Sequence, residues 1–302
     1  MKGKGMHQIH RLPGLGRTVL AVLTYPPLLK KSLRCIWIIL TRFFLFQFRS
    51  ALFPRIPVSL VEHSLDDRIP FNPGFIRIYL DFVAFWVRIA GFLSIGHGKQ
   101  GKNMAVDFVM SITKLYTYAF QIYQKNLSTT NRPNYKKNLR FLLIHLVDPH
   151  LMCIPSLHVM LVVHSYTAFR HYLRNIEEEN TNDLAEKVFR GALTITEAVL
   201  YVKQHSVNCI AAALYAMSRF DPALFNNTDA EIFVSGLFRT DKDIPAEYLP
   251  FYKGPLVHSG DATGLREYII GLFRFFQEKE STDWTVPLLD FLKTLPIDIR
   301  KK

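Results

Sequence analysis

The chain has 302 residues, of which 49% are hydrophobic, and its formal net charge is +12. This length allows one large core or two domains, and a mean hydropathy of +0.10 is low for a chain wholly embedded in lipid. Cys35, Cys153 and Cys209 are too few and too scattered for a disulfide framework, and they lack the spacing of zinc ligands. Composition therefore excludes a disulfide scaffold and a cysteine zinc module, and leaves the membrane and soluble classes open.

The amino-terminal segment carries most of the excess positive charge. Residues 1–55 contain ten Lys or Arg and no Asp or Glu. A basic segment of this kind is typical of contact with nucleic acid or with an anionic membrane surface. The apolar run Cys35–Phe48 favours the membrane, because proteins that bind single-stranded nucleic acid interleave aromatic with basic residues. A buried amphipathic helix with a solvated basic end is the alternative.

Helical periodicity dominates the chain, and no series of alternating strands is evident.

Two parts of the chain differ from this helical pattern. The acidic stretch Arg174–Lys187 is predicted to be a solvent-side connector, and residues after 220 lack long apolar runs. Within them, Gly264–Glu280 is expected to pack on its own domain or to lie on a membrane surface. Helices are predicted at Leu33–Phe48, Phe75–Ile95, Met104–Gln124, Leu139–Met152, Ser156–Leu173, Val188–Lys203 and Ser206–Arg219.

Polar residues align on one side of the third predicted helix. At about 100° per residue, Asp107, Ser111, Lys114 and Tyr118 fall close together, and a continued helix adds Lys125 to the line. A membrane bundle turns such a side inward, whereas a soluble bundle turns it outward. Periodicity does not decide between the two.

Three short stretches in fixed order carry groups suited to phosphate chemistry: Lys125–Pro133, Pro155–His158 and Lys203–Cys209. The first supplies two cations, the second a serine and a histidine, and the third a histidine beside a lysine. Such groups hold a phosphoryl oxyanion, attack its phosphorus and protonate its leaving group. Ser156 is also placed to cap a helix, whose amino terminus favours an anion.

These stretches resemble the signature of the type 2 phosphatidic acid phosphatase superfamily, which runs Lys-x6-Arg-Pro, Pro-Ser-Gly-His and Ser-Arg-x5-His-x3-Asp. Leu157 in the glycine position is similar to the branch that contains inositol phosphorylceramide and sphingomyelin synthases. The upstream segment Leu65–Phe82 extends the resemblance over roughly residues 60–220. The matching residues are Lys125, Arg132 and Pro133 in the first block, Pro155, Ser156 and His158 in the second, and His205 in the third.

The resemblance implies a role for each matched side chain. His205 would be the nucleophile that forms a phosphohistidine, and His158 would protonate the departing alkoxide and then activate water or an acceptor alcohol. The implied phosphate-binding groups are Lys125, Arg132, Ser156 and the backbone amides after Pro155.

The third stretch departs from the family pattern. Ala198 and Val199 stand where the family has serine and arginine, and Cys209 replaces the aspartate that orients the nucleophilic histidine. Lys203 is predicted either to replace the arginine as a point charge in phosphate binding or to snorkel at an interface. The candidate substitutes for the orienting carboxylate of His205 are Asn208 and Glu197.

The helical periodicity predicts an all-α protein. The resemblance, to a branch of the family that is membrane-integral, implies a multi-pass membrane helical bundle of about six core helices with a carboxy-terminal soluble appendage. Residues 1–55 would form a basic segment with the first apolar helix, 56–220 a phosphatase-like core, and 221–302 a soluble or interfacial segment. The predicted function is that of an integral-membrane lipid-phosphate phosphatase or phospho-headgroup transferase, a hydrolase-type enzyme. Its expected partners are the bilayer and a lipid phosphate or phospholipid, with no cofactor, metal or nucleic acid.

Two other functions remain open from the sequence. The first is a catalytically impaired family member that binds lipid phosphate without turnover. The second is a soluble helical protein with a basic tail that binds nucleic acid.

Overall fold

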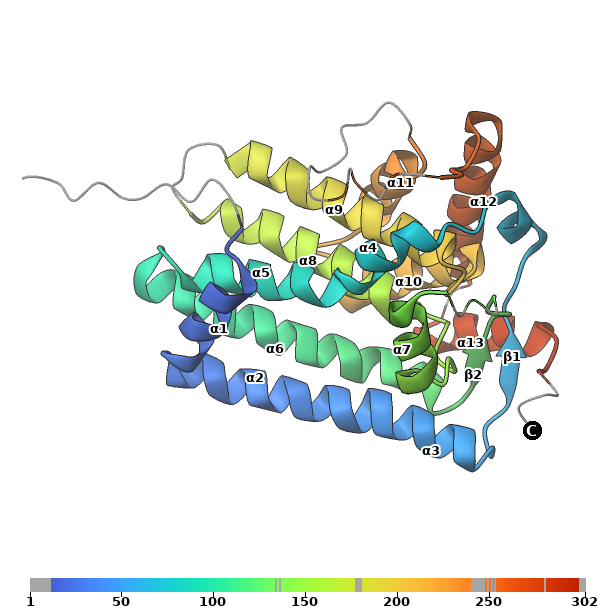
Figure 1. Ribbon diagram of the computed structural model, residues 1–302, viewed down its shortest axis with the longest axis horizontal. Helices are drawn as coiled ribbons and strands as arrows, with labels where there is room; N and C mark the ends of the chain where they lie inside the picture. Colours follow the sequence, from blue (N-terminus) through green and yellow to red (C-terminus); the bar gives the residue numbers. More distant parts are fainter. Residues whose placement is uncertain are drawn as a thin grey trace, which may run out of the picture.

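Helices form most of the computed structural model, which describes residues 12–133, 135, 137–176, 181–239, 248, 250, 252, 254–279 and 281–298. The long helices α2, α6, α5, α8 and α9 lie roughly parallel, each packed on the next (Figure 1). The all-α class predicted from the sequence is confirmed. The helical segments are α1 (Leu15–Leu23), α2 (Pro26–Ile39), the π-helical η1 (Leu40–Leu45), α3 (Phe46–Leu52), the 3-10 turns η2 (Ser64–Arg68) and η3 (Pro73–Phe75), α4 (Ile76–Leu80), α5 (Phe82–Ser94), α6 (Gly98–Tyr123), α7 (Leu139–Val147), α8 (Leu157–Leu173), α9 (Thr181–Tyr201), α10 (Val207–Phe220), α11 (Asn227–Gly236), α12 (Ser259–Glu278) and α13 (Thr285–Thr294).

The centre of the bundle consists of α8 and α10. Most residues of both helices are buried, as expected for helices surrounded by others. Their amino-terminal ends lie together, since the Ser156 N–H donates to the Cys209 carbonyl at 3.4 Å. This junction brings the second and third sequence stretches into contact.

The helix predicted at Phe75–Ile95 is interrupted at Asp81, which separates α4 from α5. The Asp81 carboxylate accepts a hydrogen bond of 2.6 Å from the Tyr248 hydroxyl and lies 3.6 Å from the Arg88 guanidinium. Both partners stabilise the carboxylate at the break. One of them belongs to the carboxy-terminal part of the chain, which the local sequence pattern does not include.

Other predicted helices also have different limits. Those predicted at Leu33–Phe48 and Met104–Gln124 begin earlier, at Pro26 and Gly98. The helix predicted at Leu139–Met152 ends at Val147, because Pro149 cannot donate a helical hydrogen bond and disfavours helix in the residue before it. The helix predicted from Val188 begins at Thr181, within the stretch expected to be a connector.

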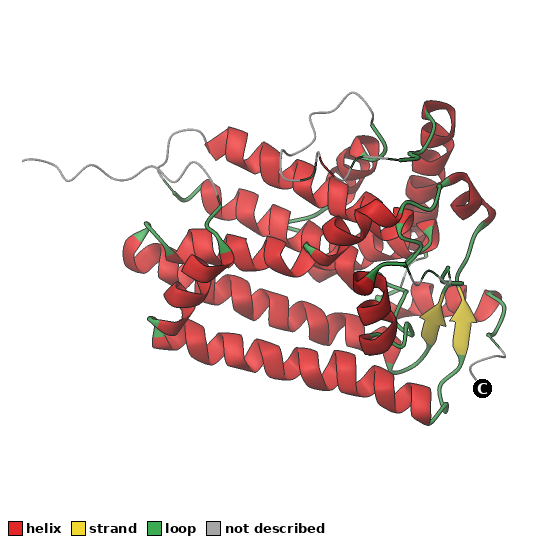
Figure 2. Cartoon of the chain, viewed as in Figure 1, coloured by secondary structure: helices red, strands yellow, loops and turns green. Residues whose placement is uncertain are grey.

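A pair of short parallel strands lies at one end of the bundle (Figure 2). β1 (Val58–Leu60) pairs with β2 (Leu127–Thr129), and Ile297 bridges to Ser59 on the other side of β1. The sequence analysis predicted no strands. Each strand has only three residues, which is too short for an alternating pattern to be recognised.

The carboxy-terminal helices pack on the bundle. α12 lies against α10 through Leu265, Ile269 and Phe273, which are at most 1% exposed, and α13 lies against α6. The segment Gly264–Glu280 was expected either to pack on its own domain or to lie on a membrane surface. In the structure, the described part of this segment packs on other helices of the chain.

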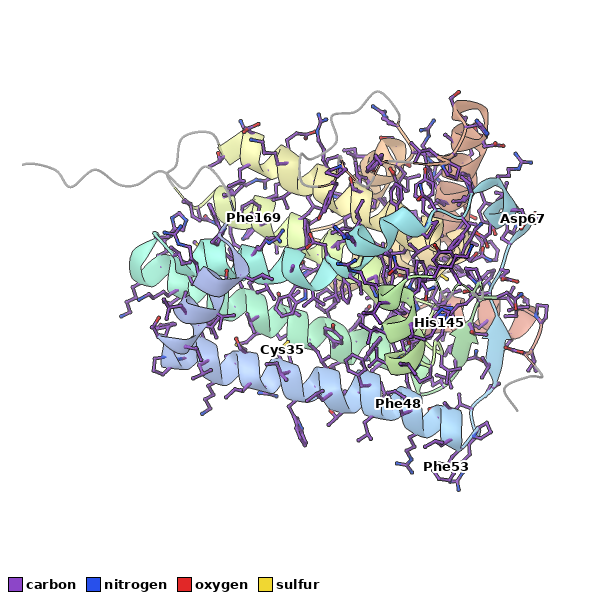
Figure 3. All side chains as sticks on the ribbon, viewed as in Figure 1. Cys35, Phe48, Phe53, Asp67, His145 and Phe169 are labelled. Carbon is purple, nitrogen blue, oxygen red and sulfur yellow. The ribbon has the colours of Figure 1, made fainter. Side chains whose placement is uncertain are left out.

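One helical segment in the described part of the chain, Pro26–Leu52, is long and apolar enough to cross a membrane. Only 17% of its most apolar window is buried. At its carboxyl end, Phe48 and Phe53 are exposed, and Phe53 lies at the lower edge of the molecule (Figure 3). This segment contains the apolar run that the sequence analysis singled out.

Candidate functional site

Two histidines meet where α8 and α10 begin. His158 lies in the first turn of α8, and His205 lies two residues before α10. The Nε2 atom of His205 is 3.3 Å from Nδ1 of His158, and the ring centroids are 5.3 Å apart. At this distance one ring donates a hydrogen bond to the other. The two histidines named by the sequence motifs therefore form a direct pair.

The backbone around His205 is fixed by a tight connection between α9 and α10. The N–H groups of Gln204 and His205 both donate to the Val199 carbonyl, at 3.0 and 3.2 Å, and so close the end of α9. Ser206 then caps α10, accepting from the Asn208 N–H at 3.3 Å. Because both neighbouring turns are hydrogen-bonded, the backbone position from which the His205 side chain extends is fixed.

Ser156 caps α8 in the same way. Its hydroxyl accepts from the Val159 N–H at 3.5 Å, and the side chain is completely buried. Since α8 and α10 both direct their amino termini towards the histidine pair, their dipoles together favour a negative charge there.

Burial strongly affects the ionisation of His205, which is only 7% exposed. Desolvation lowers the pKa of His205 well below its usual value, and His158 and the Arg132 guanidinium shift it in the same direction. The Cys153 backbone opposes this shift, although its approach to the ring is outside normal hydrogen-bond geometry. His205 is therefore a neutral imidazole at pH 7 and retains a lone pair for nucleophilic attack.

Arg132 is paired with a carboxylate that the sequence analysis did not single out, Asp148. The Arg132 Nη2 atom is 2.5 Å from Asp148 Oδ2, and Nη1 donates to the Asp148 carbonyl at 3.0 Å. The Nε atom of Arg132 is buried and makes no hydrogen bond within the described residues. Both charges lie within electrostatic range of His158. Arg132 thus belongs to the histidine cluster, and its Nε–H has no partner among the described residues.

Aromatic rings cover the other side of His158. The Tyr79 ring centroid is 4.7 Å from that of His158, and the Phe82 centroid is 4.3 Å away. These rings come from α4 and α5, on the two sides of the break at Asp81. They fix the His158 ring by packing and shield the pair from solvent.

Lys125 does not point into this cluster. Its ammonium group donates to the Thr285 hydroxyl at 3.3 Å and lies 4.0 Å from the Asp283 carboxylate. Almost half of the Lys125 side chain is exposed. The first cation of the motif therefore contacts the start of α13.

Lys203 is directed away from the histidines. It has a left-handed backbone conformation, with φ of 55°, and its ammonium group donates to the Asp66 carbonyl. Desolvation lowers the pKa of Lys203, against the opposing effect of Asp66, Asp67 and Glu62. Lys203 faces these acidic groups, and no contact with the histidine pair is present.

Asn208 and Glu197 have partners other than His205. The Asn208 amide donates to the Val61 carbonyl at 3.2 Å and accepts from the Tyr268 hydroxyl at 2.6 Å. Glu197 accepts from the Phe238 N–H at 2.7 Å. These contacts give both side chains a structural role in holding the surrounding elements.

Sequence reasoning missed two acidic residues that shape the site. The pair Asp148-Pro149 is a local signal for the end of a helix, and α7 ends just before it. The apolar periodicity, in contrast, predicts a helix that continues to Met152. Asp66 accepts from the Val207 N–H at 2.9 Å and so fixes the start of α10, and its burial raises its pKa. Asp66 lies within the segment Leu65–Phe82, which precedes the three motif stretches in the sequence.

Within the described residues, no group of three or more His, Cys, Asp or Glu side chains is arranged to hold a metal ion.

Comparisons of the chain with protein-family models, with curated proteins and with solved structures found no match.

Proposed function

We propose that this protein is a membrane enzyme that transfers a phosphoryl or phospho-headgroup from a lipid through a phosphohistidine at His205. The observation that carries the proposal is the contact between His205 and His158, beside Arg132, where two helix amino termini converge. A neutral nucleophile, a second histidine and a guanidinium are the groups that phosphoryl transfer requires.

The reaction proceeds in two displacements. His158 must enter the reaction protonated; its burial favours the neutral form, and the negative charge of the bound phosphate favours the protonated one. The His205 Nε2 lone pair forms a bond to phosphorus while the bond from phosphorus to the lipid oxygen breaks, and protonated His158 donates its proton to the departing oxygen. Water or an acceptor alcohol then attacks the phosphohistidine, giving its proton to His158, and His205 leaves as the neutral imidazole. The protein is a phosphatase with water as acceptor and a transferase with an alcohol.

The histidine contact sets a condition for substrate entry. With 3.3 Å between the two nitrogens, no phosphorus atom fits between the rings. A substrate must therefore separate them, and the rings approach again when the product leaves. Arg132 would hold a non-bridging oxygen through its free Nε, while Asp148 positions the guanidinium.

We extend the proposal to a multi-pass arrangement, in which further helices of the bundle accompany Pro26–Leu52 through the bilayer. Large apolar residues are exposed on neighbouring elements, including Leu20 of α1 at 62% and Leu146 of α7 at 65%. Such a surface is suited to lipid contact. Retention of the protein in the membrane pellet after alkaline carbonate extraction supports this arrangement, and release into the supernatant contradicts it.

A binding protein without turnover is the second candidate. It is favoured by the contacts of Lys125 with α13 and of Lys203 with acidic groups, which leave Arg132 as the one motif cation beside the histidines. Such a protein would bind lipid phosphate but release neither phosphate nor headgroup.

Turnover on a panel of lipid phosphates separates the two candidates. Purified wild type is compared with His205→Asn, His158→Asn and His171→Asn, the last at an exposed position near the other end of α8. The enzyme proposal expects the first two substitutions to abolish turnover and the third to leave it unchanged. Wild-type turnover in both site variants contradicts it, and binding without turnover in the wild type favours the second candidate.

A further inference from the structure

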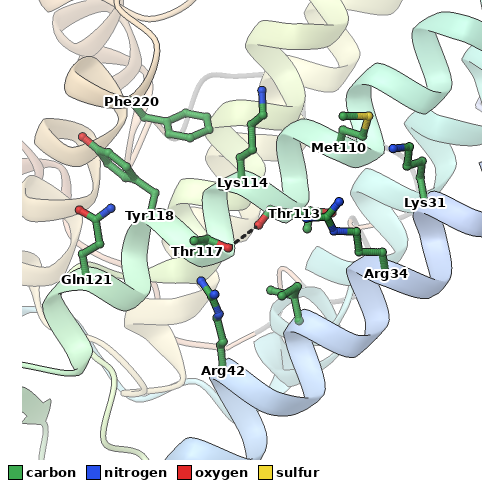
Figure 4. Close-up of a pocket in the computed structure, with 11 residues that line it drawn as sticks. Lys31, Arg34, Arg42, Met110, Thr113, Lys114, Thr117, Tyr118, Gln121 and Phe220 are labelled. Carbon is green, nitrogen blue, oxygen red and sulfur yellow. Dashed lines mark hydrogen bonds between the residues drawn. The ribbon is translucent and has the colours of Figure 1, made fainter.

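Four cationic side chains line a cavity of about 380 Å³ between α2 and α6. Lys31 and Arg34 come from α2, Arg42 from the π-helical segment η1, and Lys114 from α6 (Figure 4). Lys114 belongs to the polar line that the sequence places on one side of α6.

Within the part of the chain that the structure describes, the charges in this cavity have no acidic partner. No Asp or Glu lines the cavity, and within the described residues none of the four cations forms an ion pair. Arg42 instead lies over the Phe120 ring, 5.6 Å from its centroid. Four like charges around one cavity repel one another, and a bound anion removes that repulsion.

The π-helical segment directs Arg42 towards the cavity. In a regular α-helix, eight residues at about 100° each would turn Arg42 roughly 80° away from Arg34. A π-helical turn closes an i→i+5 hydrogen bond and so takes more residues than an α-helical turn, which reduces this angle. Such bulges are frequent at functional sites. Here η1 brings Arg42 to the same side of the long helix as Arg34.

We propose that this cavity binds the phosphate group of an anionic molecule, which is either the headgroup of a membrane phospholipid or a free phosphate ester. Arginine and lysine side chains from two facing helices supply charge-assisted hydrogen bonds to phosphate oxygens. Exposed apolar residues flank the cations on the same helix: Trp37 follows Arg34 by three positions, and Leu45 follows Arg42 by three. This neighbourhood is suited to the acyl chains of a lipid.

The cavity is separate from the histidine pair. α10 begins beside His205 and ends at Phe220, which lines the cavity. Fourteen helical residues span about 20 Å at 1.5 Å per residue. The cavity therefore shares no side chain with the histidine pair, and the binding test is made in the His205→Asn background so that no turnover interferes.

The experiment has two arms, both with the full-length chain. The first measures the lipid retained by protein in phosphatidylcholine nanodiscs that contain phosphatidylglycerol, by native mass spectrometry. The second measures binding of glycerol 3-phosphate to protein in neutral detergent, by titration calorimetry. Binding in the first arm alone identifies the lipid as the source, and binding in both identifies the phosphate ester as sufficient.

The variant Arg34→Gln/Arg42→Gln is compared with Lys30→Gln/Arg49→Gln, which removes the same charge from exposed positions of the same helical segment that do not line the cavity. We expect the first variant to weaken binding at least about tenfold, the effect of losing one charge-assisted hydrogen bond, and the second to leave it unchanged. Lys114→Gln, on the facing helix, provides the same test if the double variant does not fold. Equal weakening in cavity and control variants, or no binding in either arm by the His205→Asn protein with its cavity intact, overturns the proposal.

Discussion

Replacing Asp148 by asparagine tests whether the Arg132–Asp148 pair supports the site. The substitution preserves the shape of the side chain and removes its charge. The two side chains are 13% and 19% exposed, so water screens their interaction only weakly. The Arg132 guanidinium retains its hydrogen bond to the Asp148 carbonyl, which the substitution does not alter.

The magnitude follows from this burial. Removing one partner of a buried ion pair costs about 3–5 kcal/mol, and the residual exposure and the retained backbone bond place Asp148→Asn nearer about 2–3 kcal/mol. Arg132→Gln leaves the carboxylate unpaired and should cost a similar amount. The double variant contains neither charge, so its cost should fall short of the sum by about 1–3 kcal/mol.

The assay is thermal unfolding of the purified chain in detergent, followed by tryptophan fluorescence. In a chain of this size, 1 kcal/mol shifts Tm by roughly 2–4 °C. The control is Asp183→Asn, which breaks an exposed pair with Lys187 and should change stability by less than about 0.5 kcal/mol. Additive effects of the two site substitutions, or a shift at Asp148 no larger than that at Asp183, would refute the reasoning.

Three further predictions concern other parts of the fold. Because the pKa of His205 is lowered in the folded state, the unfolded chain binds a proton that the folded chain does not as pH falls below about 6.5. His205 alone should then lower the stability by up to about 1.4 kcal/mol per pH unit, and His205→Asn should show a flatter dependence of Tm on pH between about 6.5 and 5; parallel curves would disprove this. Tyr268→Phe removes the hydrogen bond to Asn208 and should lower the free energy of unfolding by about 1 kcal/mol without changing turnover. A loss of turnover would instead indicate that Asn208 takes part in the site. Gly91→Ala places a Cβ 2.0 Å from a threonine hydroxyl of α1 and should cost about 1–3 kcal/mol, while Gly271→Ala, which meets open space, should not destabilise the protein; equal Tm values would contradict this contrast.

The starts of α8 and α10 could be predicted closely because their signals are local. Ser156 and Ser206 precede apolar runs, and the structure has both serines as helix caps. The long helices and the all-α class follow from periodicity for the same reason. The chemical roles of His158 and His205 stay predictions, although the two rings lie within hydrogen-bond distance.

Side-chain directions at the site could not be predicted from the motifs. Lys125 turns towards Asp283 and Thr285, which lie about 160 residues away in the sequence. Lys203 turns towards Asp66, and Asn208 is held by Tyr268. A motif specifies residue types and spacing, whereas these directions depend on tertiary partners outside it.

Asp148 was missed for a different reason. The apolar pattern of Leu139–Met152 predicts that the helix continues past Val147, which places Asp148 inside the helix. The Asp-Pro pair is a local signal for the end of a helix, and in the structure it prevails over the apolar periodicity. With the helix ending at Val147, Asp148 can bind Arg132 through both its side chain and its backbone.

The most direct test of the central claim is to trap the covalent intermediate. Wild-type protein in detergent is mixed with a lipid phosphate that contains radiolabelled phosphorus, quenched with alkaline denaturant and digested, and the labelled peptide is identified. The account predicts a label that is stable in base and labile in acid, on the peptide containing His205, and its absence from the His205→Asn variant. Turnover without such a label on His205, or a label that persists in the variant, would contradict the account.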